Sequence, residues 1–124
     1  TTRRGDLRIR PMPPGGPYPQ RFVPPALACV QLAASSHVAA VVAMDAALNR
    51  RLVTRADLDA AVGLLPRARR TRAAAAVGAT DPGAESVGET RTRLALRTLA
   101  RPVRSQVELR DAHWLARVHR LLRR

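Results

Sequence analysis

The fold is decided by residues Val38–Leu65, VAAVVAMDAALNRRLVTRADLDAAVGLL, which have the pattern of two amphipathic helices joined by a tight corner. In the first part, apolar residues recur at the three- and four-residue steps of one helical face: Val38, Val41, Val42, Met44, Leu48 and Leu52. Thr54 is followed three residues later by Asp57, which predicts a capping box at the start of the second helix. Gly63 and Pro66 are the stop signals of that helix. Because few residues separate the two helices, we expect them to be antiparallel neighbours.

Two further helices, and a short apolar segment before the pair, are predicted on either side of it. Ala26–Ala34 is a short apolar segment, interpreted as a helix or turn-helix that covers the central pair. The Ala-rich segment Arg67–Gly78 has high helix propensity and ends at a glycine. Glu85–Leu99 has the spacing of another helix, in which Glu89 precedes Arg93 by four residues, the favourable order for an ion pair.

The C-terminal segment leaves two alternatives open. Val103–Arg110 alternates apolar and polar residues roughly as a strand does. Trp114–Leu122 fits either a returning strand or a helix, because it matches both an alternating pattern and a three- to four-residue spacing. The predicted fold class is therefore mainly α: a small bundle of about four helices with a short C-terminal β-hairpin or helix.

The prolines divide the chain into two parts. Seven of them lie in residues 1–25, together with several arginines. Proline removes a backbone donor and restricts φ, so we predict that residues 1–25 are an extended arm or linker. Residues 26–124 are predicted to form a single helical domain with the C-terminal hairpin.

The net charge indicates the class of partner. The chain has 22 basic residues, all of them arginine, and 9 acidic residues, which gives +13 in 124 residues. Arginine in place of lysine is typical of a GC-rich genome, whereas the sign of the charge favours anionic partners. The few aromatic residues argue against base stacking on single strands, and no recognition-helix motif indicates base readout.

Arginines grouped in two segments are the candidate binding residues. In the first segment, Arg67 and Arg70 are spaced to share a helical face, as are Arg69 and Arg72, and a planar guanidinium suits phosphate. The predicted nucleic-acid-binding set is Arg67, Arg69, Arg70, Arg72, Arg117, Arg120, Arg123 and Arg124. The expected partner is the phosphate backbone of nucleic acid or an acidic protein such as a cognate toxin. The alternative is a solvated basic face that binds nothing.

The remaining residue types predict neither a cofactor nor a membrane segment. Cys29 is the only cysteine and lies in an apolar run, which predicts a buried, inert thiol and fits a reducing cytoplasm. No apolar run approaches the ~20 residues needed to cross a bilayer, so we expect a cytoplasmic protein without a membrane partner. The three histidines are scattered and lack partners at ligand spacing, so no metal site is predicted.

Two blocks of the sequence resemble a known family. They are Val41–Leu58 and Thr80–Leu96, the latter followed by Pro102–Asp111 and Leu115–Val118. In this order and spacing, they resemble the C-terminal half of actinobacterial AbiEi-type antitoxin proteins, over roughly Phe22 to the C-terminus. The most specific part is the pattern Asp-Pro-x-Ala-Glu-Ser-x-x-Glu-Thr-x-x-Arg at residues 81–93. The resemblance implies a C-terminal domain similar to very-short-patch-repair endonucleases.

The same resemblance implies an incomplete nuclease site. In nuclease-like members, a helix glutamate joins acidic residues of two strands, and such cleavage needs clustered carboxylates around a divalent metal. Glu85 and Glu89 match the helix acids, but His119 stands where the strand aspartate is expected. The chain then stops at Arg124, before any third strand.

The sequence therefore favours a non-catalytic basic interaction module of antitoxin type. Such a module binds nucleic acid through phosphate contacts, a cognate toxin, or both, without a cofactor. One alternative is a degenerate metal-dependent nuclease that uses Glu85 and Glu89 and is completed by another chain. The other is a structural homo-oligomeric helical protein, in which self-association buries the remaining apolar surface.

Overall fold

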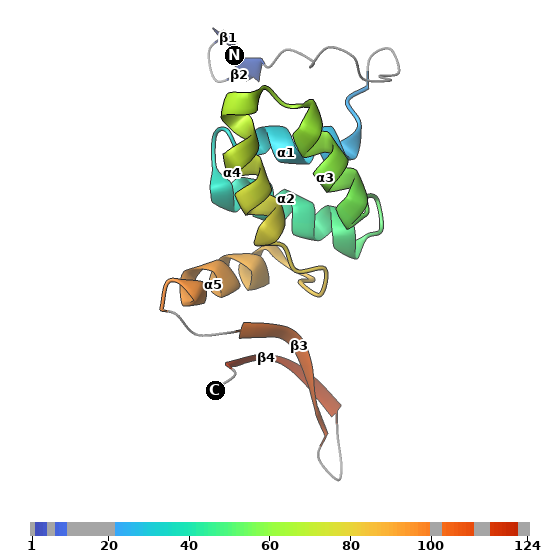
Figure 1. Cartoon of the computed structure of the whole chain (residues 1–124). Helices are drawn as coiled ribbons and strands as arrows, with labels where there is room; N and C mark the ends of the chain where they lie inside the picture. Colours follow the sequence, from blue (N-terminus) through green and yellow to red (C-terminus); the bar gives the residue numbers. More distant parts are fainter. Residues whose placement is uncertain (1, 5–6, 10–21, 100–102, 111–114, 122–124) are drawn as a thin grey trace.

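Five helices account for most of the structure, a computed structural model that describes residues 2–4, 7–9, 22–99, 103–110 and 115–121. The helices are α1 (Pro25–Leu32), α2 (His37–Asn49), α3 (Arg55–Leu64), α4 (Arg67–Gly78) and α5 (Val87–Arg97) (Figure 1). The strands are β1 (Thr2–Arg4), β2 (Leu7–Ile9), β3 (Val103–Arg110) and β4 (Leu115–Leu121). The mainly α prediction is confirmed, with five helices in these ranges instead of about four.

Helices α1 to α4 form the bundle, and α5 joins it to a hairpin. Helices α2 and α3 make no substantial contact with each other, so the expectation that they pack as antiparallel neighbours is wrong. Helix α1 contacts α2, α3 and α4, α4 contacts α2 and α3, and α5 contacts α2 on one side and β3 on the other (Figure 1). Strands β3 and β4 pair antiparallel, so residues 115–121 form a returning strand and not the alternative helix. A two-stranded hairpin is marginal on its own, and α5 supplies the surface that this one needs.

The N-terminal segment contains a second pair of strands. Strands β1 and β2 pair antiparallel, with Arg3 opposite Arg8. Helix α1 begins at Pro25, one residue before the predicted boundary, because proline is well tolerated in the first turn of a helix. Of the predicted arm, residues 1, 5–6 and 10–21 lie outside the described residues.

Short polar side chains start three of the helices. The Ser36 hydroxyl accepts a hydrogen bond from the Ala39 N–H at 3.1 Å, and the Ser86 hydroxyl accepts one from the Glu89 N–H at 3.1 Å. The predicted capping box is confirmed: the Thr54 hydroxyl accepts from the Asp57 N–H at 3.1 Å, and the Asp57 carboxylate accepts from the Thr54 N–H at 2.8 Å. These bonds satisfy N–H groups that have no partner within the helix.

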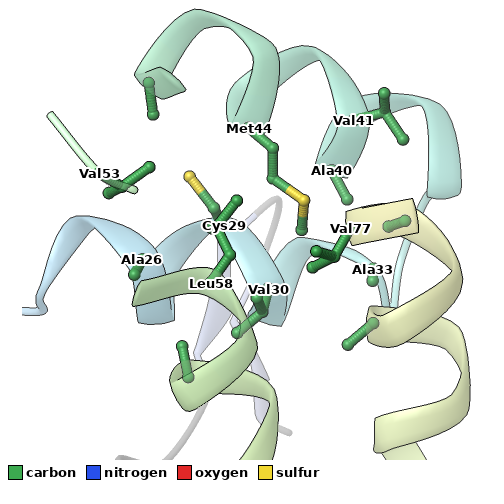
Figure 2. Close-up of a cluster of buried hydrophobic side chains, with 14 of the residues drawn as sticks. Ala26, Cys29, Val30, Ala33, Ala40, Val41, Met44, Val53, Leu58 and Val77 are labelled. Carbon is green, nitrogen blue, oxygen red and sulfur yellow. The ribbon is translucent and has the colours of Figure 1, made fainter. Parts of the chain in front are cut away.

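The core is small because alanine fills much of it. Figure 2 shows Met44 of α2 pointing toward the buried side chains of α1 and α4. The large apolar side chains that are almost fully buried are Leu27, Val30, Val41, Met44 and Leu58. Burial of each is worth roughly 1.5–3 kcal/mol, so these few groups supply much of the hydrophobic stabilisation.

Two expectations about buried residues have different outcomes. Cys29 is buried in the core, and this burial raises the pKa of its thiol, which agrees with an inert cysteine.

Leu52 was expected on the buried face of the first central helix, and this is wrong. Helix α2 ends at Asn49, and the Leu52 side chain is 63% exposed. The chain must turn before Thr54, and the turn carries Leu52 away from the core.

The corner between α2 and α3 uses a strained arginine. Arg51 has φ of 57°, its N–H donates to the Leu48 carbonyl at 3.0 Å, and the Leu52 N–H donates to the Ala47 carbonyl at 2.9 Å. This is a Schellman motif with an arginine at the left-handed position, where glycine is usual. A residue with a Cβ pays roughly 1–2 kcal/mol for that conformation.

We expect Arg51→Gly to stabilise the protein by about 0.5–1 kcal/mol, because glycine adopts the left-handed conformation without a steric cost. The neighbouring variant Arg50→Gly is the matched control. Arg50 has φ of −81°, so glycine gains nothing there and adds backbone entropy to the unfolded chain. Urea unfolding followed by circular dichroism should show shifts of opposite sign for the two variants.

Candidate functional site

Four arginines are concentrated in the first half of α4. Arg67, Arg70 and Arg72 are exposed, and Arg69 is partly buried. The Arg70 Nε donates to the Leu65 carbonyl at 2.8 Å, which anchors this side chain beside the start of the helix. We call Arg67, Arg69, Arg70 and Arg72 the α4 arginine cluster.

In the absence of a ligand, the positive charges of this cluster are repelled by the start of the helix on which they lie. The start of a helix carries the positive end of its dipole, and acidic residues are stabilising there, whereas cations are not. Helix α4 has no acidic residue in its first turn, and Pro66 offers no capping side chain. Its first N–H groups and its arginines therefore present positive charge together. An anion bound at this end would relieve the repulsion.

The other predicted arginines lie elsewhere. Arg117 and Arg120 belong to β4, which lies beyond α5, on the far side of the bundle from the start of α4 (Figure 1). The strand register places Arg117 opposite Glu108, and Arg120 opposite Arg104. Arg123 and Arg124 lie outside the described residues. The structure thus brings together the four arginines of α4 and does not unite them with those of β4.

The two glutamates proposed as helix acids are not on one helical face. Helix α5 begins at Val87, after its cap Ser86, so Glu85 precedes the helix. The Glu89 carboxylate accepts hydrogen bonds from the Glu85 N–H at 3.1 Å and from the Gln106 side chain of β3 at 3.0 Å. Glu89 thus closes the start of α5 and ties it to β3. In the described part of the chain, no three His, Cys, Asp or Glu side chains are grouped as metal ligands.

A buried polar network joins α2, α5 and the loop before α5, and the sequence did not predict it. At its centre is Asp45 of α2, which is 1% exposed. One carboxylate oxygen accepts from the Asp81 N–H at 2.7 Å. The other accepts from the Thr90 hydroxyl at 2.7 Å and from the Arg93 Nη2 at 2.6 Å. Arg93, also buried, donates its Nη1 to the Ala79 carbonyl at 2.6 Å.

This network accounts for much of the pattern at residues 81–93. Asp81, Thr90 and Arg93 converge on Asp45, while Ser86 and Glu89 form the start of α5. The predicted ion pair between Glu89 and Arg93 is wrong, because Arg93 forms its ion pair with Asp45 instead. The sequence did contain a signal, which is Asp45 itself. It is the one polar residue between the two ends of α2, and a buried carboxylate requires a partner.

Three grooves in the part of the chain that the structure describes bear on the candidate site. One, about 870 Å³, lies between the start of α2, the end of α4 and α5. A second, about 400 Å³ and mostly apolar, lies between the start of α1 and α3, and Asp57 is among its lining residues. The third, about 200 Å³, is lined by Asp45 and Glu85 among others. Only the first of these three has cationic but no acidic side chains in its lining.

Comparisons with protein-family models, curated proteins and solved structures found no match. Among the helices that the structure describes, none has both the length and the apolar character needed to cross a membrane.

Proposed function

We propose that this chain is a non-catalytic basic interaction module that binds nucleic acid through phosphate contacts, with the α4 arginine cluster as its binding surface. The observation that carries the proposal is the exposure of Arg67, Arg70 and Arg72 at a helix start that has no acid in its first turn. Phosphate groups complement both the guanidinium groups and the positive end of the helix dipole.

Two further features support this choice of partner. A net charge of +13 steers the chain toward polyanions and makes binding strongly dependent on salt. Asp45, Glu89, Thr90 and Arg93 all take part in hydrogen bonds that hold the fold together. Several polar residues of the specific pattern thus have a structural role, which leaves the exposed arginines as the groups available for a partner.

The antitoxin assignment rests on the sequence resemblance. A protein of that kind acts beside a toxin, so an adjacent gene for a nucleotidyltransferase-like toxin would support the assignment. The cognate toxin then becomes a candidate second partner of this chain, in addition to nucleic acid.

The test is the salt dependence of binding to a fluorescein-labelled DNA duplex of ~20 base pairs, followed by fluorescence anisotropy. We expect the triple variant Arg67→Gln, Arg70→Gln, Arg72→Gln to reduce the slope of log K against log salt by about 3, because each phosphate contact contributes about 0.9. Affinity should fall about 10- to 100-fold at low salt. Glutamine preserves helix propensity, and circular dichroism will report whether α4 is retained.

The control removes the same charge elsewhere. Arg50, Arg91 and Arg97 are exposed and distant in sequence from the cluster, and their triple replacement by glutamine lowers the net charge equally. An equal loss of affinity in both triple variants would show that only net charge matters and would reject the α4 site. Absence of binding by the unmodified chain at low salt would reject nucleic acid as the partner.

A further inference from the structure

The groove of about 870 Å³ between α2, α4 and α5 lies on a different part of the surface from the α4 arginine cluster. It is bordered by His37 and Val38 at the start of α2, by Gly78 at the end of α4, and by Arg91 and Arg97 of α5. The α4 arginines occupy the opposite end of that helix and do not line the groove. A ligand in the groove would therefore be held by different residues from those that contact nucleic acid.

The charged side chains of the groove are cationic. Arg91 and Arg97 are exposed, and neither forms a hydrogen bond or ion pair with the described residues. None of the described residues that line this groove carries a carboxylate. The positive start of α2 and the negative ends of α4 and α5 all reach the groove, so the helix dipoles partly cancel there. The sign of the electrostatic potential in the groove is therefore set by its charged side chains. The groove is therefore complementary to an acidic ligand.

Apolar side chains make up a large part of the groove lining, here called its apolar floor. Ala75, Ala79, Leu94 and Ala95 contribute to it, beside Val38. A phosphate backbone would satisfy the arginines but would leave this apolar floor uncovered. A peptide with acidic residues on one side and apolar residues on the other would match both features. Grooves of this kind recognise amphipathic segments through apolar residues spaced three or four apart.

We propose that this groove, between α2, α4 and α5, binds an acidic amphipathic peptide segment of a partner protein. The apolar side chains of that segment lie on Ala75, Ala79 and Leu94, and its carboxylates pair with Arg91 and Arg97. The site is independent of the nucleic acid surface, so either can fail without the other.

Gly78 provides a means of filling the groove without disturbing the fold. A Cβ placed on Gly78 has no atom within 4 Å, so a leucine there projects into open space. Gly63 of α3 is the matched control, because it is also a helical glycine with nothing within 4 Å and does not line the groove. Leucine favours the helix at both positions, so neither variant should unfold the protein.

The probe is a fluorescein-labelled synthetic peptide of about 14 residues, with leucine at every third or fourth position among glutamates. We expect saturable binding, measured by fluorescence anisotropy. Gly78→Leu and the double variant Arg91→Glu, Arg97→Glu should each weaken it by about 10-fold or more, whereas Gly63→Leu and Arg67→Glu should change it by less than about 2-fold.

Four results would overturn the proposal. The first is no binding of the peptide. The second is equal binding of a scrambled peptide of the same composition, which would show that the peptide binds through its charge and not through the spacing of its leucines. The third is equal weakening by Gly63→Leu and Gly78→Leu. The fourth is loss of DNA affinity in Gly78→Leu together with displacement of the peptide by DNA, which would make the groove part of the nucleic acid surface.

Discussion

Asp45→Ala is expected to destabilise the protein by about 3–5 kcal/mol, the cost of removing one partner of a buried ion pair. The substitution leaves the Arg93 guanidinium, which is 5% exposed, without its counter-ion. It also removes the nearer of the two acceptors of the Thr90 hydroxyl and the acceptor of the Asp81 N–H. Small domains have only about 5–15 kcal/mol in total, so the variant should unfold at a much lower urea concentration, as measured by circular dichroism.

Two comparisons separate the loss of this network from a general loss of charge. Asp59→Ala removes an exposed carboxylate from α3 and should change the stability by no more than about 0.5 kcal/mol. The double variant Asp45→Leu, Arg93→Met removes both charges and should recover much of the lost stability, because a buried pair can often be replaced by apolar residues. If the Asp45→Ala variant unfolded at the same urea midpoint as the unmodified protein, Asp45 would not be the buried centre of the fold.

Leu58→Ala is expected to cost about 3–5 kcal/mol, because the side chain is fully buried and its removal leaves a cavity. Leu58 of α3 lies beside Cys29 and Val30 of α1 (Figure 2), in a buried cluster that consists mostly of alanine and valine. Small neighbouring side chains cannot extend into the vacated space, so little of the cavity should close. Thermal and urea unfolding should both report the loss.

Leu52→Ala is the matched control for this core variant. It removes the same atoms from a leucine six residues away that is 63% exposed, so we expect a change below about 1 kcal/mol. Comparable losses in the two variants would contradict the placement of Leu52 outside the core.

The helices and the start of α3 could be read from the sequence because they depend on neighbours three or four residues apart. The Thr54 and Asp57 capping box and the end of α4 at Gly78 are local features of this kind. The start of α5 was placed two residues too early, since either Glu85 or Ser86 could begin a helix. The Ser86 hydroxyl, bonded to the Glu89 N–H, decides the position.

Tertiary contacts decided the rest, because they join residues whose spacing carries no signal. Asp45 meets Arg93 across 48 positions, and no periodicity indicates that a carboxylate of α2 and a guanidinium of α5 share one buried site. The pairing of β3 with β4 favours a strand over a helix at residues 115–121, since both patterns fit that segment alone. The net charge follows from the composition alone, but the positions of the arginines do not. The α4 arginines are separated from those of β4 by α5, which packs on α2 and carries the hairpin to the far side of the bundle.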